Sequence, residues 1–183
     1  DFKVTEILGY ELIGEGEHIY LWVRKTGLNT AYLAEQIAKF TQLPLRAVTY
    51  AGRKDKHAQT EQWFSVHLPG KSEFDWTQFN EPGAKVLKSI RHNKKLRTGV
   101  LKGNRFNITV RQLSSTSGID ERLQQIMHSG VPNYFGSQRF GNTLHDPRGG
   151  NLVLADKMIS GEAIRNRNKR SMAISALRSW LFN

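Results

Sequence analysis

The chain has 183 residues, of which 38% are apolar and 23% charged, a balance typical of a soluble globular protein rather than a disordered one. A formal net charge of +11 and a pI near 10.1 predict a polyanionic partner. The absence of cysteine excludes disulfides, zinc–thiolate sites and thiol nucleophiles. No apolar run approaches the about 18 residues of a membrane helix, and no signal peptide opens the chain.

The first 50 residues predict strands around one helix. Phe2 and Val4 alternate with polar neighbours, whereas the helix carries its apolar residues on one face. We expect a short strand at residues 2–4, a strand at 18–25, a helix from Asn29 or Thr30 to about Thr41, and a strand at 47–50.

A loop at residues 51–62 follows, between that strand and another at 62–68. It reads A-G-R-K-D-K-H-A-Q-T-E-Q, so that Asp55 lies among Arg53, Lys54, Lys56 and His57. Nearby cations favour the carboxylate form of an acid, and an ionised carboxylate outside a metal site is a candidate nucleophile or base. The alternative is an ordinary aspartate in a solvated basic turn, and spacing alone leaves both interpretations open.

The most basic stretch of the chain is residues 84–111, which hold nine Lys or Arg and no acid. One interpretation is a solvated basic hairpin. The other, which the basic character of the whole chain favours, is a surface that contacts phosphates. The candidate backbone contacts in this stretch are Lys94, Lys95, Arg97 and Lys102.

The end of this stretch alternates with the period of a strand, which places Asn104, Phe106, Ile108 and Val110 on one face. Phe106 is then either the first core residue of that row or an exposed ring. In the second case Asn104 and Phe106 stand side by side and could hydrogen-bond and stack a pyrimidine.

The last third of the chain predicts helices and polar loops. A weak capping box at Ser117 precedes a helix whose inner face carries Ile119, Leu123 and Ile126, and Gly130 is expected to end it. We further expect a packed aromatic turn at 133–141, a polar loop at 142–150, a short helix at 151–159, and a helix from Ser171 with Ile174, Leu177 and Leu181 on one stripe.

Four blocks stand in order along nearly the whole chain, namely Gly52-x-Lys54-Asp55-x-x-Ala58-x-Thr60-x-Gln62, Lys102-Gly103-Asn104-x-Phe106, Asn133-Tyr134-Phe135-Gly136-x-Gln138-Arg139-Phe140-Gly141 and Arg167-Asn168-Lys169-Arg170-Ser171. Together they resemble the TruD family of tRNA pseudouridine synthases. The resemblance implies a mixed α+β fold with a predominantly antiparallel sheet flanked by helices. It also implies a first part of the catalytic domain at 1–128 and the start of a family-specific insertion domain at 129–183. Both ends look cut, so we expect an incomplete catalytic domain that is inactive by itself.

The reaction implied by the resemblance is isomerisation of a uridine in the D-arm of tRNA, of the position-13 type, to pseudouridine. Asp55 would be the catalytic nucleophile, and Phe2, Lys54, Asn104 and Phe106 would bind the substrate. Arg139 would contact the RNA backbone, and Lys54 or Arg139 could hold the carboxylate of Asp55.

The resemblance implies tRNA as the partner, a cytoplasmic location and no cofactor, because the isomerisation consumes nothing. The six histidines show no metal-ligand spacing, and neither a P-loop nor a Rossmann fingerprint is present. We therefore expect no metal and no membrane association. The alternative function is a non-catalytic RNA-binding module.

Overall fold

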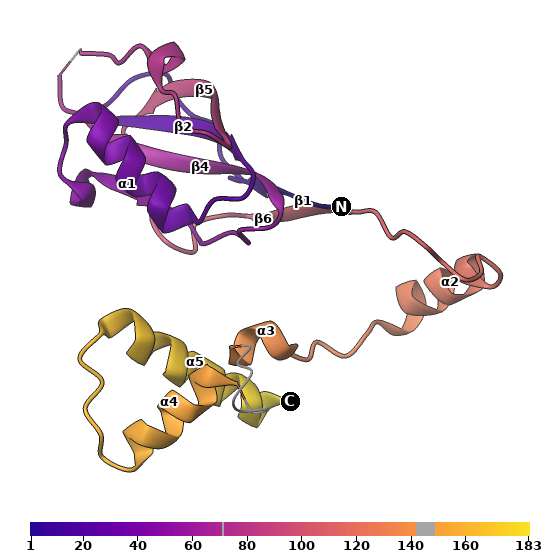
Figure 1. Ribbon diagram of the computed structural model, residues 1–183. Coiled ribbons are helices and arrows are strands. Elements are labelled where there is room, and N and C mark those ends of the chain that lie inside the picture. Colours follow the sequence, from indigo (N-terminus) through magenta and orange to yellow (C-terminus); the bar gives the residue numbers. More distant parts are fainter. Residues whose placement is uncertain (71, 142–148) are drawn as a thin grey trace. The chain divides into compact units, whose positions relative to one another are not determined.

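The computed structural model describes residues 1–70, 72–141 and 149–183. The chain forms two compact units, Asp1–Ser114 and Ser115–Asn183 (Figure 1). The predicted division at residue 128 concerns the domains of the family, and it stays a prediction. Within the described part of the chain, no helix has the length and apolar character that a membrane crossing requires.

The first unit is built on a six-stranded sheet. The strands hydrogen-bond in the order β5-β2-β4-β1-β6, and β3 also pairs with β4. The pairing of β1 with β4 is parallel and the other pairings are antiparallel, which confirms the predicted mixed fold with a predominantly antiparallel sheet. The strands are β1 (Phe2–Ile7), β2 (His18–Lys25), β3 (Val48–Tyr50), β4 (Gln59–His67), β5 (Ala84–His92) and β6 (Gly103–Ile108).

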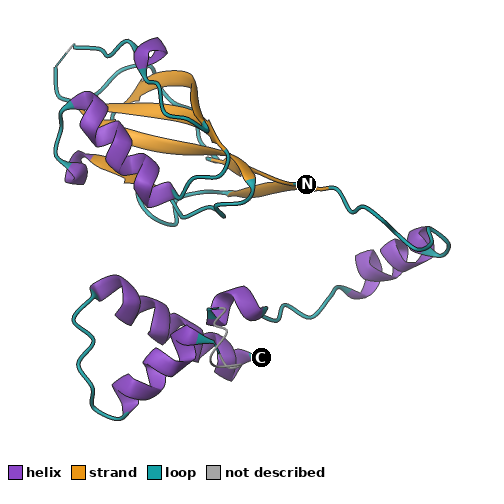
Figure 2. Ribbon diagram, in the orientation of Figure 1, coloured by secondary structure: helices purple, strands orange, loops and turns teal. Residues whose placement is uncertain are grey.

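Helix α1 (Thr30–Thr41) lies across one face of this sheet (Figure 2). Asn29 is the N-cap, and Gln42 ends the helix in the left-handed conformation. Leu33 and Ile37 of α1 pack with Leu21, Val23 and Phe64 in the main core. Each such side chain contributes about 1.5–3 kcal/mol when fully buried, so α1 and the two central strands form the stable base of the unit. Two 3₁₀ turns, η1 (Leu45–Ala47) and η2 (Trp76–Gln78), complete it.

A second buried cluster joins Leu8, Tyr20, Ala51 and Leu96. Ala51 begins the loop that carries Asp55, and Ala58, which ends it, is also buried. Both ends of the loop are therefore fixed by the core, although its charged residues are not part of it.

The basic stretch at residues 84–111 is not a hairpin. β5 pairs with β2, and β6 pairs antiparallel with β1, so the two basic strands lie at opposite ends of the strand order. The hairpin was the less favoured interpretation of this stretch. Strands that are neighbours in sequence often pair, but here each basic strand pairs with a strand from the first 25 residues.

The second unit consists of α2 (Ile119–Ser129), α3 (Ser137–Phe140), α4 (Gly150–Ile159) and α5 (Arg167–Phe182). The helices predicted near residues 119, 151 and 171 are confirmed. α5 begins earlier than predicted because the side chain of Asn166 accepts a hydrogen bond from the main-chain N–H of Lys169 (3.0 Å) and caps the helix. The polar loop predicted at 142–150 lies outside the described residues except for its last two.

The buried faces of these helices differ from the predicted ones. On α5 the buried residues are Ala173, Ala176 and Ser179, whereas Ile174 and Leu181 are exposed. α2 has Gly118 rather than Ser117 as its N-cap, and within this fully described helix no side chain is buried. Small residues allow α5 to approach α4 closely, which an apolar stripe alone does not reveal.

Candidate active site

Asp55 lies on the loop between β3 and β4, as the sequence predicted. The side chain is half-buried, and its Oδ1 accepts a hydrogen bond from the main-chain N–H of His57 at 2.7 Å. This is the geometry by which aspartate side chains stabilise turns two residues ahead. The turn therefore orients one carboxylate oxygen within the loop.

Lys25 hydrogen-bonds the main chain of the same loop. It ends β2 and is 0% exposed. Its Nζ donates to the carbonyl oxygens of Leu28 (2.8 Å) and Asp55 (2.9 Å). Burial lowers the pKa of Lys25, and the charge of Asp55 acts in the opposite direction. A buried cation is therefore fastened to Asp55 and stabilises negative charge there.

Thr30 and Gln62 form a second buried tether. Thr30 Oγ1 donates to Gln62 Oε1 at 3.0 Å and accepts from the main-chain N–H of Lys54 at 2.9 Å. Gln62 Nε2 in turn donates to the carbonyl of Gly52 at 3.4 Å. The loop is thus bound to the start of α1 and to β4 at residues on both sides of Arg53.

Glu6 and Lys54 form a buried ion pair in the same region. Lys54 Nζ is 2.5 Å from Glu6 Oε1, and the side chains are 8% and 0% exposed. Glu6 Oε2 accepts from the main-chain N–H of Trp63 at 2.7 Å. Burial raises the pKa of Glu6, while the hydrogen bonds from Lys54 and Trp63 oppose that rise. The ammonium of Lys54, which was expected to contact the substrate or Asp55, thus pairs with the buried carboxylate of Glu6. Contact of Lys54 with the substrate stays a prediction.

The proposed substrate pair, Asn104 and Phe106, lies on β6 at the edge of the sheet. The register pairs Glu6 with Asn104 and Val4 with Phe106, and opposed residues in a sheet share a face. Phe106 is 57% exposed and stacks on Phe2, which is 37% exposed, with ring centroids 5.9 Å apart and planes 6° apart. The alternative that makes Phe106 a core residue does not describe this structure.

These two groups of residues are linked through Glu6. Glu6 stands opposite Asn104 in the sheet and pairs with Lys54, the residue next to Asp55. The Asp55 loop and the Asn104–Phe106 face are therefore tied to the same strand, β1. Such an arrangement can place a carboxylate near a base that is stacked on an exposed ring.

The basic connection between β5 and β6 presents its cations from a fixed main chain. Lys94, Lys95 and Arg97 are exposed, whereas Leu96 between them is buried. The hydroxyl of Tyr20 donates to the carbonyl of Lys94 at 3.1 Å. Further along, the N–H of Gly99 donates to the carbonyl of Ala51, where the Asp55 loop begins, at 2.9 Å. The side chain of Lys102 is also exposed, and its main-chain N–H donates to the carbonyl of Ile7 at 2.9 Å.

Arg139 belongs to the second unit. Its Nη1 donates to Ser175 Oγ at 3.2 Å, and its guanidinium lies 4.7 Å from the ring centroid of Phe135. The aromatic turn packs only in part: Phe135 contacts Phe182 edge-on at 5.8 Å, whereas Tyr134 is exposed. Among the described residues, no group of three or more His, Asp or Glu side chains is arranged to hold a metal ion.

No role was predicted for Lys25 or Glu6, because charged residues usually face solvent. One signal was present in both cases. Lys25 continues the alternation of Ile19, Leu21 and Val23, and Glu6 continues that of Phe2 and Val4. A charge in register with a core row indicates a buried, paired group.

Comparisons with known proteins agree with this fold. The family model of tRNA pseudouridine synthase D (TruD) matches residues 1–163. The chain is 72% identical over 183 residues to tRNA pseudouridine synthase D of Pseudoalteromonas atlantica, and 51% identical to that of Shewanella oneidensis. These alignments cover 100% of the chain but 52% and 48% of the relatives, so the chain spans about half their length.

A crystal structure described as TruD from Methanosarcina mazei superposes with a TM-score of 0.63 at 29% identity. The match covers 87% of this chain and 37% of that one. Family model, relatives and solved structure agree, and the chain belongs to the TruD family of tRNA pseudouridine synthases.

Proposed function

We propose that the protein containing this chain isomerises a uridine of tRNA to pseudouridine, with Asp55 as the carboxylate that acts on the substrate. The observation that carries the proposal is the support of Asp55. The buried Lys25 donates a hydrogen bond of 2.9 Å to the carbonyl of Asp55, and the main-chain N–H of His57 donates one of 2.7 Å to its carboxylate. Positioning of this kind is what covalent or acid–base catalysis requires.

The reaction breaks the bond between N1 and C1′, turns the base and joins C5 to C1′. The proton lost from C5 is balanced by the proton gained at N1, so no co-reactant is consumed. An ionised Asp55 could attack C6 of the ring or C1′ of the sugar, or could remove a sugar proton. Each route requires the charged form, which the neighbouring Lys25 favours.

We further propose that the target is a uridine of the D-arm and that its base is held on the edge of the sheet. Enzymes that act on a base in folded nucleic acid must first extrude it, at a cost of a few kcal/mol. The exposed ring of Phe106 offers a stacking surface worth about 1–3 kcal/mol. Asn104 on the same face can hydrogen-bond the base edge, and Phe2 supports the ring from one side.

Binding of the tRNA backbone is assigned to the exposed cations of the connection between β5 and β6, namely Lys94, Lys95 and Arg97, together with Lys102. Such contacts release counterions and dominate affinity for nucleic acids. The net charge of +11 is consistent with this assignment. Arg139 of the second unit is proposed as a further backbone contact.

The competing function is an RNA-binding module without catalysis. Such a module gains nothing from an acid inside a basic loop, since the acid repels phosphate. The hydrogen bonds by which Lys25, Thr30 and Gln62 hold the main chain of the Asp55 loop also favour catalysis.

The test is incubation of the full-length protein with unmodified tRNA transcript, followed by mapping of pseudouridine by its mass shift after chemical derivatisation. We expect modification at one D-arm uridine. Tight binding of the transcript without any pseudouridine would favour the binding module, and modification outside the D-arm would retain the chemistry but reject the target.

A further inference from the structure

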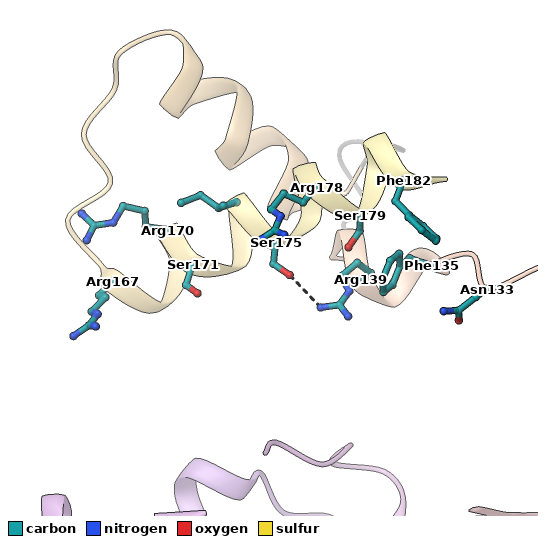
Figure 3. A pocket seen from close by; sticks show the side chains of 11 residues that line it. Asn133, Phe135, Arg139, Arg167, Arg170, Ser171, Ser175, Arg178, Ser179 and Phe182 are labelled. Atoms are coloured by element: carbon teal, nitrogen blue, oxygen red, sulfur yellow. Dashed lines mark hydrogen bonds between the residues drawn. The ribbon is translucent and has the colours of Figure 1, made fainter. Parts of the chain in front are cut away.

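The second unit contains a pocket of about 640 Å³ between residues 133–139 and one face of α5 (Figure 3). Eight of its eleven lining residues carry hydrogen-bond donors in their side chains, and four of these are arginines. The arginines are Arg139, Arg167, Arg170 and Arg178. No acid is among the described residues that line the pocket.

One wall of the pocket is held rigidly. Phe135 and Asn183 exchange two hydrogen bonds of 2.8 Å, and the rings of Phe135 and Phe182 meet edge-on at 5.8 Å. Arg139 lies on the Phe135 ring and donates to Ser175, the bond dashed in Figure 3. This guanidinium is therefore pre-oriented, which reduces the entropy lost when it binds a ligand.

The opposite wall is a stripe of α5. Arg167, Arg170, Ser171, Ser175 and Arg178 follow the three- and four-residue steps that place side chains on one face of a helix. From Arg167 to Arg178 the stripe extends for roughly 16 Å, at about 1.5 Å per residue. That length exceeds what one small anion occupies and fits a chain that carries several anionic groups.

The charge of this wall is unfavourable in the absence of a ligand. The first turn of α5 contains no acid, although it contains Arg167 and Arg170. Cations at the positive end of a helix dipole are destabilising. An anion in the pocket would relieve both the dipole and the repulsion among the guanidiniums. Arginine also matches phosphate oxygens with two parallel hydrogen bonds.

We propose that this pocket binds backbone phosphates of RNA, through Arg167, Arg170 and Arg178 of α5 and the pre-oriented Arg139. The inference rests on the proposed action on tRNA, because that function supplies a polyphosphate ligand. The pocket adds a second phosphate-binding region to the one proposed around Lys94, Lys95 and Arg97. It lies on the unit that does not contain Asp55, and it gives a role to Arg167, Arg170 and Arg178.

The test compares two double variants of the full-length protein that remove the same charge from the same stretch. Arg167→Gln with Arg170→Gln alters the pocket. Arg165→Gln with Lys169→Gln removes two neighbouring cations that do not line it. Affinity for a fluorescent tRNA transcript is measured from low to high salt, and the melting temperature of each protein is recorded.

Each lost phosphate contact is expected to reduce the slope of log K against log salt by about 0.7–0.9, or the affinity about five- to eightfold at 0.1 M salt. The pocket variant should therefore lose about 25- to 60-fold, and the control variant much less. Inorganic phosphate, added as competitor, should weaken tRNA binding to the wild type more than to the pocket variant.

Equal losses in the two variants would overturn the proposal, since the effect would then be one of general charge. An unchanged salt slope with a lower melting temperature would also overturn it, because the arginines would then bind groups of the protein itself. Phosphate binding that leaves tRNA affinity unchanged would show a site for a free anion. Replacement of both arginines by lysine keeps the charge and should retain most of the slope if the Gln variant folds poorly.

Failure here is separable from failure of the proposed function. Wild-type protein that forms pseudouridine while the pocket variant keeps its salt slope would reject only the pocket. Wild-type protein that forms no pseudouridine, yet shows the expected difference in slope, would reject only the isomerisation.

Discussion

Lys25→Met tests whether the buried lysine positions the loop that carries Asp55. Methionine has a similar length and fits the buried site, but it leaves the carbonyls of Leu28 and Asp55 without their donor. A buried polar group that loses its partner costs about 1–3 kcal/mol. For two carbonyls the loss of unfolding free energy is at most roughly 6 kcal/mol. The variant no longer buries a charge, which offsets part of this loss, so we expect a net loss of about 2–4 kcal/mol.

Turnover should fall more than binding. Lys25 is 0% exposed and cannot touch RNA, but its loss frees the main chain of Asp55. A displacement of about 1 Å at a reacting group can cost on the order of 100-fold in rate. The assay is single-turnover pseudouridine formation at saturating tRNA, together with the tRNA Kd and urea unfolding. The proposed signature is a lower rate per folded molecule with an unchanged Kd.

Lys56→Met is the matched control, because it removes the same charge from an exposed position of the same loop. It should weaken tRNA binding slightly and leave stability and rate nearly unchanged. If Lys25→Met keeps the wild-type rate, or if both variants lose rate equally, the positioning role of Lys25 is wrong.

The titration of Lys25 gives a further signature. Because its pKa in the folded state is lowered, the unfolded chain binds more protons between that pKa and the ordinary lysine value. In that window the free energy of unfolding of the wild type should rise with pH relative to Lys25→Met. An equal pH dependence of the two proteins would show that burial does not lower the pKa of Lys25 in the folded state.

Three further predictions concern the rest of the site. Lys54→Met should cost about 3–5 kcal/mol in urea unfolding, because it leaves Glu6 buried without its cation; adding Glu6→Gln should recover part of the loss, and additive effects would disprove the coupling. Phe106→Ala should raise the activation barrier of turnover by about 1–3 kcal/mol without lowering the melting temperature, since the ring is exposed. Phe106→Tyr should change the rate little. A lower melting temperature at full activity would instead show that Phe106 has a packing role. Neutralising Lys94, Lys95 and Arg97 together should flatten the salt dependence of tRNA binding by about 0.7–0.9 per contact, and an unchanged slope would remove these residues from the RNA surface.

Elements with a long, regular pattern were predictable from the sequence. Residues 18–25 are rich in β-branched and aromatic side chains and form β2 with those bounds, and α1 begins and ends where its cap and periodicity indicated. The position of Asp55 between two strands followed from the same local patterns. Its identification as a catalytic candidate depended on the resemblance, because one acid among cations fits many ordinary loops.

Features that depend on contacts between distant residues were not predictable in this way. The partners of β5 and β6 are set by cross-strand packing, which the basic composition of residues 84–111 does not encode. The Glu6–Lys54 pair joins residues 48 positions apart. On α5, Ala173 and Ala176 are buried because they allow close approach, whereas the larger Ile174 and Leu181 stay exposed.

The central claim is that Asp55 carries the chemistry, and substitution of its charge tests that claim most directly. Asp55→Asn keeps the shape of the side chain and removes its charge. Glu61→Gln is the internal control, since Glu61 lies six residues on, on β4, and pairs with Arg24 at 2.7 Å. The measurement is pseudouridine yield and tRNA Kd for the wild type and both variants of the full-length protein.

We predict that Asp55→Asn reduces the rate of pseudouridine formation by several powers of ten, so that no product is detected. Each power of ten corresponds to about 1.36 kcal/mol of activation free energy. It should bind tRNA equally or slightly more tightly, because a negative charge leaves a basic surface. Glu61→Gln should retain both properties. Substantial turnover by Asp55→Asn, or parallel loss of binding and activity in that variant alone, would contradict the assignment.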